Sequence, residues 1–410
     1  MIARRQLPVH STLTLRALMS GAVGAMGVNA QRALTWRIRN YWGARDVAFT
    51  SGGTAALSLA MRAALRGDDA LIALPAYGCY DLATAAEGAG ARVVLYDLEP
   101  HSLAPDPESL ERALKLGPRA LVLVHLFGLP VDIMSLAARA AGQGVVIIED
   151  AAQAIGALLG GRPAGSFGSV SILSFGRGKG LTGGSGGALL ANDDTGSRIL
   201  EHARLSLAGT RAGWSDLARA AAQWTVGRPA LYSLPAALPF LRLGQTVYHP
   251  PQSPRVLSRA AAGMIFRNWK SALEAAARRR ATATRLIAAA RTNSAWRTLP
   301  LTSEGVASYL RLPLLANGDA RAVVLSRSAA KLGIMQGYPM PIVKLPGFAH
   351  RCINGNERFP GAELLAERLF TLPTHDLLND RDVLALQHWL SDTGAEKPGR
   401  QREALAGRRA

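Results

Sequence analysis

Cysteine is scarce in this sequence: its 410 residues contain only two, Cys79 and Cys352, which lie far apart. Two distant cysteines exclude the disulfide framework of small secreted proteins and are typical of a reducing compartment. Cysteine and histidine do not occur at the spacing of a zinc site, so we expect no bound metal. The scarcity of cysteine therefore favours a cytoplasmic protein.

Long apolar runs are also missing. No stretch of about 20 uninterrupted apolar residues occurs, so we expect no membrane-spanning segment. Residues 1–27 are basic and only weakly apolar, without the strongly apolar centre of a signal peptide, so we do not expect secretion. Residues 229–243 are apolar but contain three prolines. We interpret them as a surface loop, a dimer contact or a patch resting on a membrane, so peripheral membrane contact stays open.

Acidic residues are outnumbered. The chain has 29 Asp and Glu against 47 Lys and Arg, a formal net charge of +18. This excess favours an anionic substrate or an acidic membrane surface, with a plain solvated basic surface as the alternative. No nucleic-acid-binding motif accompanies the charge, so nucleic acid is not an expected partner. Part of the excess lies in residues 394–410, whose low apolar content predicts a disordered tail.

What the sequence does contain is an alternation of short apolar runs and helical patterns between residues 47 and 193. Several runs are continuously apolar, as in strands covered on both faces, so we predict an α/β fold with a mostly parallel sheet. Residues 257–291 predict a long helix, and residues 305–392 predict a smaller α+β domain. The predicted division is a basic N-terminal arm (1–35), a large α/β domain with a connecting segment (36–250), a small C-terminal domain (251–393) and the tail (394–410).

A glycine-rich loop, GRGKG, carries Lys179; Ser174 lies shortly before it, and Asp150 ends the apolar run VVIIED further upstream. This set suits pyridoxal phosphate, because an amine forms a Schiff base, a hydroxyl binds phosphate and a carboxylate keeps the pyridine nitrogen protonated. The glycines leave room for the ring, and Arg177 adds positive charge that favours a neutral, nucleophilic lysine. The alternatives are an exposed loop lysine and an aspartate that caps the next helix.

A second loop, at residues 51–54, predicts a phosphate site. It reads SGGT and lies between a predicted strand and a predicted helix. Gly53 lets the backbone approach an anion, Thr54 adds a hydroxyl, and a helix N-terminus offers unpaired N–H groups. The alternative is an ordinary helix cap with a tight turn.

Three side chains are candidates for contact with the ring of the cofactor. Gln153 could contact its phenolic oxygen, although it could instead form a capping box with Asp150. Tyr77 and Tyr80, in PAYGCYDLA, are the candidates for stacking on the ring. Cys79 lies between them, but no histidine is placed to activate it as a catalytic thiol.

Two more polar residues lie at strand ends. His125, in LVLVHLFG, either lines the pocket or is a structural histidine with satisfied ring nitrogens. Glu149 precedes Asp150, and strand alternation points it to the opposite face.

Six motifs in order resemble the DegT/DnrJ/EryC1/StrS aminotransferases, over about residues 40–392. They are TSGGTAAL, LPAYGCYDLATAAEGAGARVVLYDL, VHLFGLPVDI, EDAAQAIGA, SFGRGKGLTGGSGG and FPGAELLAERLFTLPTHDLL. The resemblance implies PLP-dependent aminotransferase fold type I, with helices on both faces of a mostly parallel central sheet and a smaller C-terminal α+β domain. It also implies a cytoplasmic homodimer whose active site lies at the subunit interface. The implied reaction transfers an amino group, usually from glutamate, to a nucleotide-linked keto-sugar in polysaccharide or glycoconjugate biosynthesis.

Matched position by position, the resemblance implies a role for each candidate. Lys179 is the Schiff-base lysine, Asp150 pairs with the pyridine nitrogen, and Gln153 lies by the ring oxygen. The residues that hold the phosphate are Gly53, Thr54 and Ser174.

Three departures from the family pattern concern the acceptor and the dimer. Ser185 stands where many members have a glutamate, and Cys79 stands where many have an aromatic residue. The segment G.NyR, whose asparagine reaches the partner's cofactor, is not found; Arg267 and Asn268 are a weak substitute for it.

Two other functions remain as alternatives. One is another fold type I enzyme, a lyase or a dehydratase, although the similar dehydratases have a histidine in place of Lys179. The other is a non-catalytic scaffold at a membrane surface, which would bind no cofactor and show no near-visible absorbance.

Overall fold

The computed structural model describes residues 5–65, 71–207, 209–233, 246–317 and 326–393. Two of the sequence predictions fall wholly or partly outside these residues. The predicted disordered tail, 394–410, lies outside them, and so does most of the proline-broken apolar segment. Cys79 and Cys352 are both free thiols.

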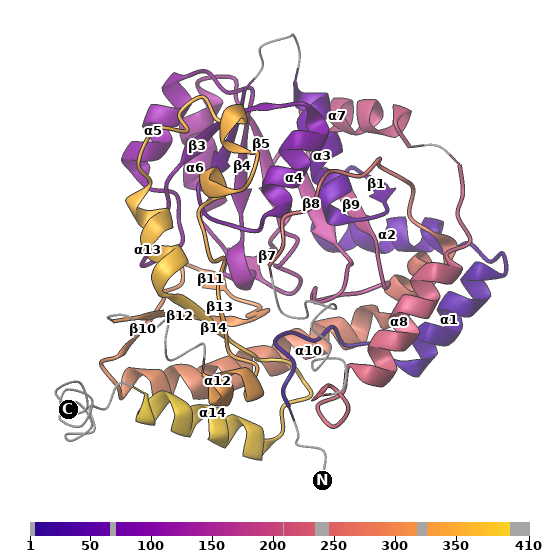
Figure 1. The fold of residues 1–410 in the computed structure, drawn as a ribbon. Coiled ribbons are helices and arrows are strands. Elements are labelled where there is room, and N and C mark those ends of the chain that lie inside the picture. The colour runs from indigo at the N-terminus through magenta and orange to yellow at the C-terminus, as the bar shows by residue number, and fades with distance from the viewer. Residues whose placement is uncertain (1–4, 66–70, 208, 234–245, 318–325, 394–410) are drawn as a thin grey trace.

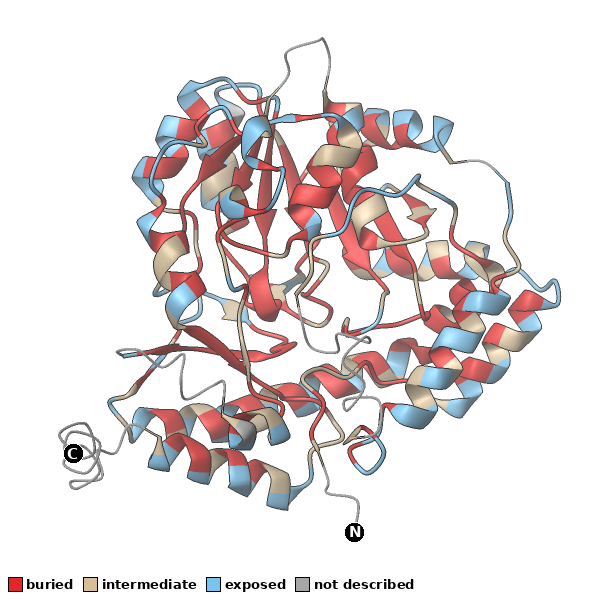
Figure 2. Ribbon diagram, viewed as in Figure 1, coloured by how far each residue is buried: buried red, intermediate tan, exposed pale blue. Residues whose placement is uncertain are grey.

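A seven-stranded sheet forms the larger unit (Figure 1), in the order β1-β9-β8-β5-β4-β2-β3. Neighbouring strands are parallel except where β9 pairs antiparallel with both β8 and β1. Every residue of β4, β8 and β9 is buried, so both faces of the sheet are covered, as expected for an α/β fold (Figure 2). The strands are β1 (Asp46–Thr50), β2 (Leu71–Pro75), β3 (Arg92–Tyr96), β4 (Ala120–Val124), β5 (Val146–Asp150), β8 (Val170–Ser174) and β9 (Gly187–Ala191).

Helices between the strands provide this cover, and their ends follow local sequence signals. Asp106 caps one helix and precedes a proline at its first position, and Asp132 caps another by accepting from the Ser135 amide. The helices are α2 (Gln31–Trp42), α3 (Gly53–Ala64), α4 (Asp81–Ala89), α5 (Pro107–Lys115), α6 (Ile133–Ala141) and α7 (Asp194–Leu205).

A smaller antiparallel sheet, in the order β10-β12-β14-β13, forms the second unit. Its strands are β10 (Trp296–Thr298), β12 (Leu312–Ala316), β13 (Met335–Gln336) and β14 (Leu369–Leu372), and its helices are α12 (Arg327–Lys331), α13 (Pro360–Arg368) and α14 (Asp380–Asp392). The short strands β6 (Leu158–Leu159), β7 (Arg162–Pro163) and β11 (Gly305–Val306) form a third sheet. Single 3₁₀ turns occur at η1 (Leu126–Gly128), η3 (Ile342–Lys344) and η4 (Ala349–Arg351).

The long helix α10 (Arg259–Arg291) connects the two units. It packs against α1 (Leu15–Ala25) and α8 (Trp214–Val226) on one side and against α14 and β10 on the other. A Cβ at Gly263 would lie 2.6 Å from the Ser20 carbonyl oxygen, so this glycine lets α1 approach α10 closely. Because α10 packs against both units, the predicted domain boundary at residue 250 stays a prediction.

The N-terminal segment, residues 5–13, runs in extended form between the two units (Figure 1). His375 Nε2 donates to the Leu7 carbonyl at 3.0 Å, and the Gly178 amide donates to Ser11 Oγ at 2.9 Å. This part of the predicted basic arm therefore touches the loop that carries Lys179. Among the described residues, no helix is both long enough and apolar enough to cross a membrane.

Candidate active site

The candidate residues meet at one edge of the large sheet. Asp150 ends β5 and Ser174 ends the neighbouring strand β8, while Thr50, Gly187 and Ser174 lie side by side across β1, β9 and β8. The carboxyl ends of parallel strands gather at one edge, where α/β proteins bind ligands. The chain order of the candidates thus becomes a spatial cluster.

A phosphate-sized cradle forms where α3 begins. The first backbone bond into the helix comes from the Ala56 amide to the Gly52 carbonyl, and the described residues provide no acceptor for the amides of Thr54 and Ala55. A Cβ at Gly53 would lie 2.7 Å from Ser174 Cβ and 2.9 Å from Ser174 Oγ, so the hydroxyl lies directly beside the helix N-terminus. Free amides and hydroxyls are the donors that a phosphate requires, and the helix dipole favours its negative charge. Thr54 is half-buried beside them.

Lys179 lies in a fixed loop. Its amide donates to the Gly176 carbonyl at 3.3 Å, and Gly178 adopts a positive φ of 80° that favours glycine. The Gly178 amide is held by Ser11, as described above. Lys179 itself is half-buried rather than open to solvent.

Asp150 is a buried carboxylate close to that lysine. Its Oδ1 accepts from the Ala152 amide at 2.9 Å, and residues 151–157 form turns, so it caps no helix. Burial raises the pKa of Asp150; the Ala152 amide, the positive charge of Lys179 and the nearby His125 oppose the rise without cancelling it. A buried carboxylate of this kind requires a cationic partner, and a protonated pyridine nitrogen is one.

Gln153 is oriented by both ends of its amide. Its Oε1 accepts from the Phe127 amide at 2.9 Å, and its Nε2 donates to the Tyr338 hydroxyl at 2.9 Å. No capping box with Asp150 forms, and one Nε2 hydrogen is left for the oxygen of a ring. The predicted role of Gln153 stays a prediction.

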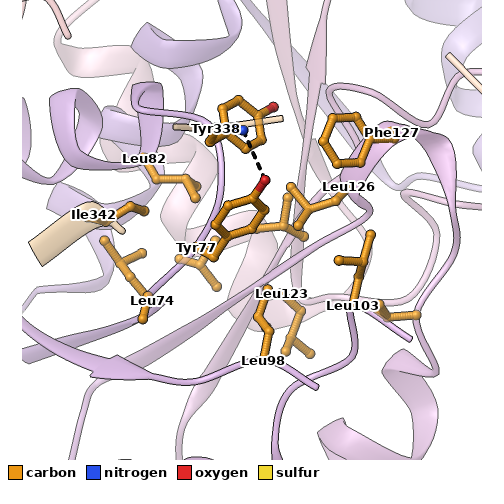
Figure 3. Close-up of a cluster of buried hydrophobic side chains, with 14 of the residues drawn as sticks. Leu74, Tyr77, Leu82, Leu98, Leu103, Leu123, Leu126, Phe127, Tyr338 and Ile342 are labelled. Atoms are coloured by element: carbon orange, nitrogen blue, oxygen red, sulfur yellow. Dashed lines mark hydrogen bonds between the residues drawn. The ribbon is translucent and has the colours of Figure 1, made fainter. Parts of the chain in front are cut away.

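The candidate tyrosines both hold the segment around residue 338. The amide of Tyr338 donates to the Tyr77 hydroxyl at 2.9 Å (Figure 3). The amide of Met340 donates to the Tyr80 hydroxyl at 3.1 Å. Phe127 stacks on Tyr338, with ring centroids 5.7 Å apart and planes 20° from parallel. Stacking of Tyr77 or Tyr80 on a cofactor ring therefore stays a prediction.

Tyr338 and Phe127 were missed by the sequence reasoning. Tyr338 lies in an irregular segment far along the chain, which carries no periodic signal. Phe127 has a positive φ of 56°, an uncommon conformation for a residue with a large side chain. Only the folded chain brings both of them to Gln153.

His125 and Glu149 form a buried pair that supports the site from behind. His125 Nδ1 accepts from the Val131 amide at 3.1 Å, so Nε2 carries the proton and donates to Glu149 Oε1 at 2.8 Å. Burial alone would raise the pKa of Glu149, but hydrogen bonds from His125, Gly168 and Gly165 outweigh burial and lower it. Of the two interpretations of His125, the structural one is therefore correct.

The departures from the family pattern have structural outcomes. Asn268 is buried, donates to the Thr12 carbonyl and accepts from the Thr14 amide at 3.2 Å. It fixes its own N-terminal segment and does not replace the missing asparagine, so that reading of Arg267 and Asn268 is wrong. The buried Ser185 Oγ has no hydrogen-bond partner among the described residues.

Together these groups fit pyridoxal phosphate. The helix cradle suits its phosphate, the buried carboxylate with a raised pKa suits its ring nitrogen, and Lys179 suits its aldehyde.

Comparison with known proteins agrees with this fit. The sequence profile of the DegT/DnrJ/EryC1/StrS aminotransferase family matches residues 10–225, just over half of the chain. The L-glutamine:2-deoxy-scyllo-inosose aminotransferase of Streptomyces kanamyceticus is 35% identical over 204 residues, 48% of each chain. The GDP-perosamine synthase of Vibrio cholerae is 35% identical over 173 residues, 41% of this chain and 46% of its own length. The chain thus spans about half the length of the curated relatives it matches.

Solved structures share the fold across nearly the whole chain. The aminotransferase TlmJ from Streptoalloteichus hindustanus has a TM-score of 0.74 at 24% identity and covers 94% of this chain and 98% of its own. The sugar aminotransferase CalS13 from Micromonospora echinospora has a TM-score of 0.74 at 20% identity, with 96% and 100% covered. The predicted fold class is confirmed. The chain therefore belongs to the DegT/DnrJ/EryC1/StrS aminotransferase family.

Proposed function

We propose that this protein is an aminotransferase that moves an amino group from glutamate to a nucleotide-linked keto-sugar, in polysaccharide or glycoconjugate biosynthesis. The observation that carries the proposal is the meeting of Lys179, Asp150 and the α3 cradle at one sheet edge. Relatives named as sugar-modifying enzymes support the acceptor class, among them the GDP-perosamine synthase and a UDP-N-acetyl-3-dehydro-alpha-D-glucosamine 3-aminotransferase of Acidithiobacillus ferrooxidans.

Each side chain has a distinct task in this proposal. Pyridoxal phosphate supplies an aldehyde that condenses with amines and a ring that accepts electrons when a C–H bond is broken. Lys179 Nζ would hold the cofactor through its aldehyde and, when free, would take the proton from the donor's α-carbon. Asp150 keeps the ring nitrogen protonated, and Gln153 orients the ring through its oxygen.

The phosphate end serves as an anchor. Gly53, which lets the backbone approach, Thr54 and the Ser174 hydroxyl would hold it without taking part in bond breaking. This anchoring would keep the cofactor at the sheet edge while Lys179 moves the proton, with Asp150 available to its ring nitrogen.

We also propose that the protein works as a cytoplasmic homodimer. The exposed apolar side chains of Leu15, Met19, Met26 and Trp36 lie on or next to α1 and α2, which supports burial against a second copy. Two free cysteines support a reducing compartment.

The absorption spectrum tests the cofactor and the lysine together. Purified protein should absorb in the near-visible, and borohydride reduction should fix the label on the peptide that contains Lys179. Lys179→Ala should bind the cofactor but lose turnover, whereas Lys270→Ala, which removes an exposed lysine on α10, should keep it. An active Lys179→Ala variant, or a label on another lysine, would refute the assignment.

A second assay separates transfer from elimination. Keto acid should form from glutamate in stoichiometric amounts in a single turnover and catalytically when a nucleotide keto-sugar is present. Release of ammonia without amino transfer would favour a lyase instead.

A further inference from the structure

Buried polar atoms without hydrogen-bond partners gather around the N-terminal segment. The described residues contain thirteen such side-chain atoms, and nearly half of them lie here. A buried donor without a partner is costly, so a concentration of them in one place indicates a missing ligand. The six residues, called here the polar cluster, are Gln6, His10, Arg279, Ser308, Arg311 and His375.

Leu7 lies between two members of this cluster, His375 and Arg311. Its carbonyl oxygen accepts from His375 Nε2 at 3.0 Å and would lie 2.7 Å from a Cβ on Gly333. The Gly333 carbonyl in turn accepts from Arg311 Nη2 at 3.0 Å. The rings of His10 and His375 have centroids 6.0 Å apart.

Arg279 lies directly beside the reactive loop. Its side chain is 1% exposed; Nε donates to the Ser308 carbonyl at 3.1 Å, and Nη2 has no partner among the described residues. A Cβ at Gly180, the residue after Lys179, would lie 3.3 Å from that Nη2. Burial lowers the pKa of Arg279 to about 10, so the guanidinium still carries its charge at neutral pH.

Arg311 repeats this arrangement from the small sheet. The residue is 8% exposed; its Nε and Nη2 donate to Thr371 and Gly333, and its Nη1 has no partner in the described ranges. Burial lowers the pKa of Arg311 to about 9, which again leaves it charged at pH 7.

The cluster has too little negative charge to match these cations. Asp376 is the neighbouring carboxylate, but it already accepts from Thr12 at 3.0 Å and lies 3.5 Å from Arg278 and 4.0 Å from His10. In the part of the chain that the structure describes, neither Arg279 nor Arg311 has a carboxylate within ion-pair distance. A buried cation without a counter-ion destabilises the fold, and an oxyanion is the partner that a guanidinium fork binds best.

We propose that Arg279 and Arg311 bind an oxyanion of the substrate, a carboxylate or a phosphate, on the small-sheet side of the Lys179 loop. The assignment of this anion to the substrate rests on the proposed function. The anion site itself rests on the two unpartnered guanidinium nitrogens. Because Arg279 Nη2 lies beside Gly180, the bound anion would lie next to the loop that carries Lys179. The oxyanion comes either from the carboxylate of the amino donor or from the phosphates of the nucleotide acceptor.

Calorimetric titration of the cofactor-loaded protein with succinate and with inorganic phosphate tests the site. Arg279→Gln and Arg311→Gln should each weaken binding of at least one probe about tenfold to a hundredfold, since each loses a charge-assisted hydrogen bond. Arg285→Gln is the matched control, because it removes the same charge from an exposed position six residues further along α10. It should leave both affinities within about twofold.

Equal affinities of Arg279→Gln and Arg285→Gln for both probes would overturn the proposal. If Arg311→Gln fails to fold, Arg279→Gln alone decides, with its melting temperature and cofactor absorbance as checks on folding. Arg279→Lys, which keeps the charge without the fork, should recover part of the affinity.

The source of the oxyanion follows from the two half-reactions measured separately. A donor carboxylate predicts that Arg279→Gln raises the concentration of glutamate needed for the half-reaction and leaves the nucleotide acceptor unchanged; a phosphate predicts the reverse. A protein that takes up no cofactor but binds succinate through Arg279 would contradict the proposed function and keep the anion site.

Discussion

Glu149 and Asp150 are neighbours in the chain, but their carboxylates differ in how far hydrogen bonds compensate the negative charge. Glu149 accepts hydrogen bonds from His125, Ser171 and the amides of residues 165, 167 and 168, so its charge is well compensated. Asp150 has one amide partner and a raised pKa. The uncompensated carboxylate is the one at the proposed cofactor ring, as expected when a site is built for its ligand rather than for stability.

We expect Asp150→Asn to stabilise the cofactor-free protein at pH 7. Because the pKa of Asp150 is raised in the folded state, ionisation of its carboxyl group opposes folding. The protonated carboxyl therefore favours the folded state fully below its ordinary pKa of 3.8, and this contribution to stability is lost as the pH rises through the raised pKa. Asparagine never ionises and keeps the bond from the Ala152 amide. Urea unfolding at pH 7 should therefore show a higher free energy of unfolding for the variant, and the difference should vanish below about pH 4.

The same change should cost activity. Without the carboxylate, the protonated ring nitrogen loses its counter-charge, and we expect kcat to fall about a hundredfold or more. A variant that is less stable than the parent without cofactor, or as active as the parent with it, would contradict this account of Asp150.

At this scale the sequence predicted best what lies at strand ends. Asp150, Ser174 and Gly53 could be placed together because parallel strands end at one edge. Arg279, Tyr338 and Phe127 could not, because they reach the site from a long helix, an irregular segment and a strained turn. Their roles depend on how the two units pack, which no local pattern encodes.

Among the elements, the junction of β1, α3 and β8 allows the sharpest test. A Cβ at Gly53 would lie 2.7 Å from Ser174 Cβ, so Gly53→Ala must displace Ser174 and distort the cradle. We expect the dissociation constant of pyridoxal phosphate to rise at least about tenfold, as measured by its absorbance in a titration of cofactor-free protein.

Gly52→Ala is the control for this change. Gly52 has extended backbone angles, and a Cβ there would meet no atom within 4 Å, so the affinity should stay within about twofold. An equal loss of affinity in both variants would mean that a disturbed N-terminus of α3, and not the contact with Ser174, weakens cofactor binding.

The elements also show where hydrophobic pattern stops being informative. The apolar runs correctly indicated the strands of the large sheet, but GGALLAND forms β9, which runs opposite to its neighbours. An apolar run buried on both faces reads the same in either direction, so strand direction was not predictable. The two-residue strands β6, β7 and β11 are too short to give a periodic signal.

For the whole molecule, the net charge of +18 leads to a prediction about the rate at which an anionic acceptor meets the protein. A positive field raises the encounter rate of an anionic acceptor, and salt screens that field. We expect kcat/KM for a nucleotide keto-sugar to fall between about 0.01 M and about 1 M salt, over which the Debye length drops from about 30 Å to about 3 Å. The value of kcat should change little, and an uncharged acceptor analogue should show no such fall; an equal fall for both would exclude steering.

The position of the N-terminal segment determines when the site can be completed. Leu7 meets His375 across 368 residues of chain, and Thr12 meets Asp376 across 364. Contacts this distant in sequence form late, because the intervening chain must first be synthesised and folded. The Gly178 amide has its partner, Ser11, on the same segment, so the segment that fixes the loop of Lys179 is itself held by residues that follow β14. In a chain that is still being synthesised, or that is truncated before these residues, the loop of Lys179 therefore lacks this support. We expect the ability to react to be acquired late in folding.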